Sequence, residues 1–203
     1  MLVTDRRRAQ IPLLEAIKLA IAGGVDVVQI REKDLSAPDG VRLASQIIEI
    51  VADRAAIVIN SDVESARLLR TGLHLSDSEL NGDLVDRSTL QPGTMIGRSI
   101  HRADEQPDPH YDYVLFGHIY PTASKSGSAP RGLAQLRHIV LRSGIPVWAI
   151  GGITAENVSD VIETGAMGVA VIGAILDSLD PEGAAREIRT AIDTASRSFA
   201  GER

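Results

Sequence analysis

The 203-residue sequence predicts one domain, residues 1–203, folded as a (β/α)8 TIM barrel. Eight short apolar segments alternate with amphipathic helical segments along the whole chain, as a closed parallel barrel requires. The residues that directly follow these segments are almost all polar or glycine, which is typical of strand ends that meet at one mouth. A doubly wound open sheet is the less favoured alternative. Its glycine-rich loop would follow the first strand, where this sequence has three arginines at 6–8.

The expected strands are apolar runs too short for core helices and rich in β-branched residues. In chain order they cover residues 2–4, 25–30, 57–59, 73–75, 95–99, 113–116, 147–150 and 169–172.

The expected helices have apolar residues repeating at helical spacing. They cover residues 13–21, 41–51, 63–69, 133–141, 154–162 and 184–192, with a weak signal for a short helix near Leu84. Thr154 is the expected N-cap of its helix. Residues 102–110 contain Pro107 and Pro109, so we expect a loop where the barrel pattern would place a helix.

Composition excludes several classes of function. A net charge of −6 argues against a general binder of nucleic acid or of anionic membranes, which would need a basic face. The sequence has no cysteine, so disulfides, thiolate metal sites and cysteine nucleophiles are ruled out. We expect a cytoplasmic protein, because no apolar run reaches membrane length and the start of the sequence leaves no room for a signal peptide.

The segment around the sixth strand offers the clearest candidate for chemistry. The apolar run 113–116 stops at Gly117, and His118 follows, a side chain that exchanges protons near neutral pH. The next loop contains Thr122, Ser124 and Lys125, which are hydroxyl donors and a cation. The sequence therefore predicts a catalytic histidine beside a polar loop at the barrel mouth. The alternative is a histidine packed at a strand end beside a solvated loop.

The turns after the last two strands predict a phosphate site. Gly151 and Gly152 follow strand seven, and Ile172 and Gly173 follow strand eight. Backbone N–H groups in such turns can hold a phosphate without a lysine, and many barrels bind phosphate at this place. A tight turn without a ligand is the alternative.

The ends of the other strands supply further candidates. Arg31 and Lys33 follow strand two and are expected to meet an anionic ligand, although a solvated charged loop is the commoner fate of such a run. Asn60 and Ser99 follow strands three and five, and the alternative for Asn60 is a turn cap. His74 and His101 are less specific, since each can be a packed histidine.

Motifs spread along nearly the whole chain resemble the thiamine phosphate synthase superfamily, whose fold is a (β/α)8 barrel. They are LVTDR, QIREKD, VIN, GLHL, IGRSIH, DYVLFGHIYPTASKSG, PVWAIGGITAENV and GVAVIGAI. Synthases usually have proline after the strand-six glycine, where this chain has His118. They hold magnesium through an aspartate after strand three and a carboxylate after strand four, where this chain has Ser61 and Glu79. GRSIH and VLFGHIY are more similar to the thiazole tautomerase branch, whose catalytic histidine matches His118.

The resemblance implies an isomerase that aromatises a phosphorylated carboxythiazole by proton transfer through His118. It implies no metal and no other cofactor, phosphate contacts at residues 151, 152, 172 and 173, and a homodimer. The surrounding pocket would consist of Arg31, Lys33, Asn60, Ser99, Thr122, Ser124 and Lys125. Two alternatives stay open: a magnesium-dependent thiamine phosphate synthase, and a non-catalytic regulator that senses a ligand.

Overall fold

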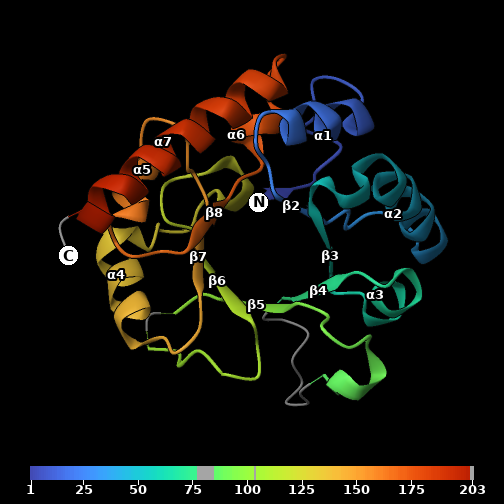
Figure 1. The fold of residues 1–203 in the computed structure, drawn as a ribbon, viewed down its shortest axis with the longest axis horizontal. Coiled ribbons are helices and arrows are strands. Elements are labelled where there is room, and N and C mark those ends of the chain that lie inside the picture. The colour runs from blue at the N-terminus through green and yellow to red at the C-terminus, as the bar shows by residue number, and fades with distance from the viewer. Residues whose placement is uncertain (77–84, 103, 202–203) are drawn as a thin grey trace.

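A computed structural model describes residues 1–76, 85–102 and 104–201 of the chain and confirms the barrel (Figure 1). Its sheet has eight parallel strands hydrogen-bonded in the order of the sequence. The strands are β1 (Leu2–Val3), β2 (Val27–Ile30), β3 (Ala56–Asn60), β4 (Gly72–Leu75), β5 (Ile96–Ile100), β6 (Tyr113–Gly117), β7 (Val147–Ile150) and β8 (Gly168–Ala170).

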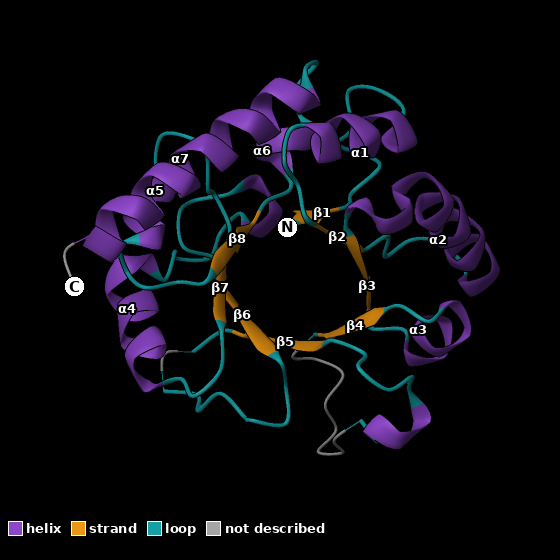
Figure 2. Ribbon diagram, viewed as in Figure 1, coloured by secondary structure: helices purple, strands orange, loops and turns teal. Residues whose placement is uncertain are grey.

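The first and last strands close the ring that Figure 2 shows from its end. Leu2 pairs with Val171 in a parallel bridge just beyond β8. The N–H of Val3 donates to the Val171 carbonyl at 2.9 Å, and the N–H of Val171 donates to the Met1 carbonyl at 3.1 Å. The carboxyl ends of all eight strands therefore point to one face.

The helices form the outer layer (Figure 2). They are α1 (Leu13–Ala22), α2 (Ala37–Val51), α3 (Val63–Leu69), α4 (Gly132–Arg142), α5 (Val158–Ile162), α6 (Gly173–Leu176) and α7 (Pro181–Gly201), with short 3-10 helices at Ala52–Arg54, Arg87–Thr89 and Ala123–Lys125. No helix among the described residues combines the length and apolar composition that a membrane span requires.

Three helical predictions need comment. The described residues between β5 and β6 form no helix, as Pro107 and Pro109 predict. Thr154 as an N-cap is wrong: α5 begins at Val158, and the Asn157 side-chain oxygen accepts a bond from the Thr154 N–H at 2.9 Å. That bond closes a turn over residues 154–157, which precedes the first residue of the helix. The short helix expected near Leu84 lies outside the described residues.

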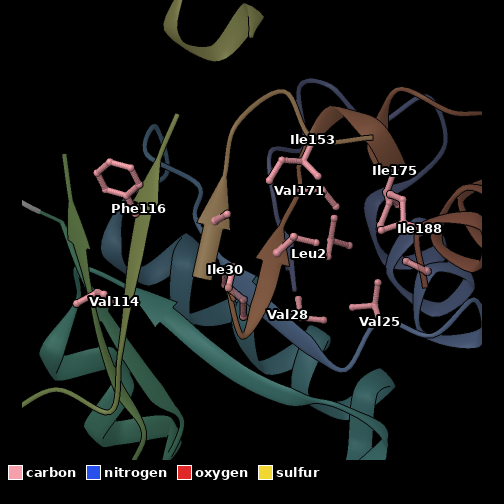
Figure 3. Packing of buried hydrophobic residues seen from close by; sticks show 14 of the residues in the cluster. Leu2, Val25, Val28, Ile30, Val114, Phe116, Ile153, Val171, Ile175 and Ile188 are labelled. Carbon is pink, nitrogen blue, oxygen red and sulfur yellow. The ribbon is translucent and has the colours of Figure 1, made fainter. Parts of the chain in front are cut away.

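Side chains alternate between two cores along each strand, as the pleat requires. Val114 and Phe116 of β6 face outward into a core shared with the helices, and Tyr113 and Leu115 face inward into a smaller core inside the barrel. In Figure 3, Leu2 and Val28 from the strands gather with Ile175 and Ile188 from α6 and α7 in the outer core.

Candidate active site

A cavity of about 830 Å³ opens at the carboxyl ends of the strands. Its volume lies within the range of small-molecule sites. Every residue that the sequence predicts for the site lines this cavity: Arg31, Lys33, Asn60, Ser99, His118, Thr122, Ser124, Lys125, Gly151, Gly152, Ile172 and Gly173. The fold therefore brings these residues together, and their individual roles stay predictions.

The charged segment after β2 is divided between two environments. Arg31 and Lys33 line the cavity, whereas Glu32 and Asp34 turn to Arg6. An Arg6 nitrogen lies 3.0 Å from Glu32 Oε2 and 2.6 Å from Asp34 Oδ1. Neither cavity-lining cation forms a salt bridge with a carboxylate of the described residues. Burial lowers the pKa of Arg31 below its ordinary value, and Asp5 and Glu32 offset this only in part, so a bound anion would further compensate a buried charge.

The glycine turn after β7 has a packing reason as well as a possible ligand role. Gly151 and Gly152 have φ of 103° and 68°, a region that favours glycine. A Cβ at Gly151 would lie 2.3 Å from His118 Cβ, and one at Gly152 would lie 2.5 Å from the Pro121 carbonyl oxygen. Both glycines thus allow the chain after β6 to pack against this turn. Within the described residues the N–H groups of Gly152 and Gly173 have no hydrogen-bond acceptor, so they are available to an oxyanion.

Arg8 also lines the cavity, although the sequence did not predict it as a site residue. Its Nε donates to Asp177 Oδ1 at 2.9 Å, and an outer nitrogen donates to the Ser124 hydroxyl at 3.0 Å. A Cβ at Gly173 would lie 2.2 Å from the Arg8 guanidinium. The hydrogen bonds to Asp177 raise the pKa of Arg8. The predicted phosphate end therefore combines backbone N–H groups with a cation, where backbone groups alone were expected.

His118 is buried, with 4% of its surface exposed, and lines the cavity. Its Nε2 lies 3.3 Å from the Ser128 carbonyl oxygen, so a proton on Nε2 forms a hydrogen bond there. This bond ties the loop that carries Thr122, Ser124 and Lys125 to the end of β6. The structure thus gives His118 a role as a loop anchor, and its role as a proton carrier stays a prediction.

The two other candidate histidines, His74 and His101, lie in different environments. His101 lines the cavity, with Nδ1 3.2 Å from the Gly117 carbonyl oxygen. His74 lies below the cavity, and both of its ring nitrogens have partners. The remaining polar residues that line the cavity and were not predicted for the site are Asp5, Gln29, Ser76, Thr154 and Asp177. Gln29 could have been found, because it is a polar side chain inside an otherwise apolar strand.

The described residues do not match the magnesium ligands that the family resemblance implies. Where an aspartate would follow β3, the Asn60 amide donates to the Ser61 hydroxyl at 2.7 Å, and that hydroxyl lies 3.3 Å from the hydroxyl of Ser76. Magnesium favours carboxylate oxygens, and no cluster of three or more His, Cys, Asp or Glu side chains suited to a metal occurs among the described residues. Glu79, the candidate second carboxylate, lies outside them.

Comparison with known proteins gives a consistent family. The family described as thiamine monophosphate synthase matches residues 1–175. The chain is 34% identical over 200 residues to a thiamine-phosphate synthase of a Roseiflexus species, covering 95% of this chain and 84% of that protein. It is 39% identical over 184 residues to one from Methanoculleus marisnigri, covering 88% and 87%. A solved thiamine phosphate pyrophosphorylase from Pyrococcus furiosus superposes with a TM-score of 0.82 at 27% identity, covering 96% and 95%.

The two sequence relatives are named thiamine-phosphate synthases and the solved one a thiamine phosphate pyrophosphorylase, so the expectation of an isomerase is wrong. That expectation rested on His118, whose Nε2 is bonded to the Ser128 carbonyl, and on Ser61 and Glu79 at the positions where synthases hold magnesium. The barrel, the shared cavity and the extent of the matches agree. The chain belongs to the thiamine monophosphate synthase family.

Proposed function

We propose that this protein is a thiamine-phosphate synthase, a transferase that joins a pyrimidine diphosphate ester to a thiazole phosphate. The bond between the pyrimidine methylene carbon and its diphosphate breaks, and the same carbon bonds to the thiazole nitrogen. Diphosphate leaves, and thiamin phosphate is the product. The names of the relatives support this choice over a tautomerase.

The observation that carries the proposal is a cavity with anion-binding groups at two separate places. At the ends of β7 and β8 lie the N–H groups of Gly152 and Gly173 together with the Arg8 guanidinium. At the end of β2 lie Arg31 and Lys33, without carboxylate partners among the described residues. Two substrates that each carry phosphate need two such places.

We assign the monophosphate of the thiazole to the glycine end, because N–H groups and one guanidinium suit a single phosphate. We assign the diphosphate to Arg31 and Lys33, with Ser99 beside them. Negative charge grows on the diphosphate as its bond to carbon breaks, so fixed cations there would stabilise the transition state more than the ground state. No step here runs through magnesium, because the described donor set does not fit it.

One assay tests the proposal. The purified protein is mixed with thiazole phosphate and the pyrimidine diphosphate ester, with magnesium in one arm and with a chelator in the other, and thiamin phosphate is quantified. We expect product in at least one arm and none with Arg31→Gln. A separate mixture contains only the carboxythiazole phosphate that is not yet aromatic.

Aromatisation of that compound at an accelerated rate, with no thiamin phosphate in either arm, would overturn the proposal. Product formed only with magnesium would place metal ligands among residues outside the described part, such as Glu79. Self-association as a homodimer stays a prediction, and the elution volume of the purified protein tests it.

A further inference from the structure

We infer that a buried chain of hydrogen bonds, running from Tyr113 through His74, fixes the Ser99 hydroxyl as a donor toward an anion in the cavity. The three residues belong to β6, β4 and β5, which are neighbouring strands of the sheet (Figure 2). His74 Nδ1 lies 3.0 Å from the Tyr113 hydroxyl, and His74 Nε2 lies 2.8 Å from Ser99 Oγ. Ser99 lines the cavity, whereas His74 and Tyr113 do not. They are positioning residues, and the identity of the anion rests on the proposed function.

Tyr113 reaches His74 across the strand between them. Gly97 of β5 pairs with both residues, with His74 on one side and Tyr113 on the other. A Cβ at Gly97 would lie 2.0 Å from Cζ of the Tyr113 ring, so only glycine leaves room for the ring there. The rings of Tyr113 and His74 then stack, with centroids 5.6 Å apart and planes 29° apart. This packing holds the hydroxyl against Nδ1.

His74 is neutral in this environment. Only 1% of its surface is exposed, and its pKa is lowered to about 3, mainly by burial and to a smaller extent by Arg31 and His101. A neutral imidazole has one N–H donor and one acceptor nitrogen. His74 therefore donates one of its two hydrogen bonds and accepts the other.

The buried Tyr113 hydroxyl sets the direction of the chain. Only 3% of the Tyr113 surface is exposed, and among the described residues the side-chain acceptor within hydrogen-bond distance of its hydroxyl is His74 Nδ1, whereas the Gln29 amide nitrogen lies 3.8 Å from Met1 Sδ. If His74 donated to the Tyr113 oxygen, the Tyr113 hydroxyl proton would be buried without an acceptor, which is costly. The arrangement that satisfies every group has Tyr113 donating to His74 Nδ1.

The consequence falls on Ser99. With Nδ1 as acceptor, His74 carries its proton on Nε2 and donates to Ser99 Oγ. The hydroxyl proton of Ser99 cannot then point back at His74 and is left to donate into the cavity. A committed donor suits phosphate oxygens, which only accept, and it lies in the same cavity as the cations Arg31 and Lys33, which have no salt bridge to a carboxylate within the described part of the chain.

The first test reads the proton position directly in the unmodified protein. Long-range nitrogen–proton correlation spectra of protein labelled with ¹⁵N-histidine distinguish the two tautomers. We expect His74 to show a proton on Nε2 alone, unchanged between pH 5 and pH 8. A proton on Nδ1 would reverse the chain of donors and overturn the inference.

The second test measures the affinity for inorganic pyrophosphate by calorimetry. We expect Ser99→Ala to weaken binding by about tenfold, the effect of losing one hydrogen bond to a charged group. Tyr113→Phe should weaken binding by about threefold, because His74 loses its fixed proton direction, and it should have no effect in the Ser99→Ala background. Tyr111→Phe is the matched control, since the buried Tyr111 hydroxyl has no partner among the described residues and does not line the cavity.

Equal losses from Tyr113→Phe in both backgrounds would show general loosening of the barrel and overturn the inference, as would no binding of pyrophosphate to the wild type. Failure of the proposed function gives a different pattern. In that case the tautomer and the coupling between the two substitutions remain as expected, and only thiamin phosphate is missing.

Discussion

The Arg8 guanidinium donates a 3.0 Å hydrogen bond to the Ser124 hydroxyl, and this bond joins the loop after β1 to the loop after β6 across the mouth of the barrel. The same guanidinium pairs with Asp177 and lies against Gly173. Three loops that are distant in the sequence thus meet at one cation, at the end of the cavity assigned to a single phosphate.

Arg8→Gln should therefore weaken binding of inorganic phosphate and raise the KM for thiazole phosphate, each by about tenfold, because a charge-assisted hydrogen bond is lost. Calorimetry and initial rates measure the two effects. Arg7→Gln is the matched control: the Arg7 side chain is 69% exposed and pairs with Asp34 instead. Equal effects of both substitutions would assign the loss to net charge and contradict a specific contact.

Gly97→Ala should destabilise the fold by about 1–3 kcal/mol, because the new methyl group overlaps the Tyr113 ring within the packed interior. Urea unfolding measures the change. Gly40→Ala is the same substitution at an open position within α2, where no atom lies within 4 Å of the new Cβ, so the opposite effect on stability is expected. That variant should be more stable by about 0.5–1 kcal/mol. A neutral Gly97→Ala would mean that Tyr113 can leave its place at little cost.

His118→Ala tests the anchor against the proton carrier. If His118 mainly holds Ser128, the loop 122–128 should exchange its amide protons faster and substrate KM should rise, with a smaller effect on kcat. Hydrogen exchange and initial rates measure both. A fall in kcat of about 10² or more with unchanged exchange would instead support the proton-transfer role that the sequence predicts.

Burial of neutral His74 should make the protein less stable in acid. Its pKa is about 3 in the folded protein against an ordinary value of 6.5, so between these values the unfolded chain binds a proton that the folded chain does not. The free energy of unfolding is therefore unaffected by protonation of His74 above pH 6.5. It decreases as the pH falls from 6.5 toward 3, with a slope of at most about 1.4 kcal/mol per pH unit. Urea unfolding between pH 7 and pH 5 measures it, and the slope should be smaller in His74→Gln. Titration of His74 above pH 5 in the folded protein would contradict this account.

The sequence predicts the barrel and the lining of its cavity well because both follow from local patterns. Periodicity locates each strand, and the fold places the residue after each strand at the mouth. Arg8 was missed because its partner Asp177 is 169 positions away. The direction of the bonds around His74 depends on Gly97 admitting the Tyr113 ring, a packing fact that no local pattern contains.

The choice between isomerase and synthase could not be made from the site residues alone. His118 fits a proton carrier by type and position, but its ring also meets the Ser128 carbonyl, ten residues along the chain. The sequence does not distinguish a histidine that is hydrogen-bonded to a backbone carbonyl from one that contacts a substrate.

The alternation after β2 has an electrostatic consequence for how substrates arrive. The charges of residues 31–34 sum to zero. Arg31 and Lys33 nevertheless line the cavity, whereas Glu32 and Asp34 are hydrogen-bonded to Arg6. At physiological ionic strength the Debye length is about 8 Å, so the net charge of −6 spread over the exterior hardly repels a distant anion. A phosphorylated molecule that reaches the mouth instead meets a local positive field. Electrostatic attraction therefore acts at the cavity entrance, and the outer surface does not guide the substrate toward it.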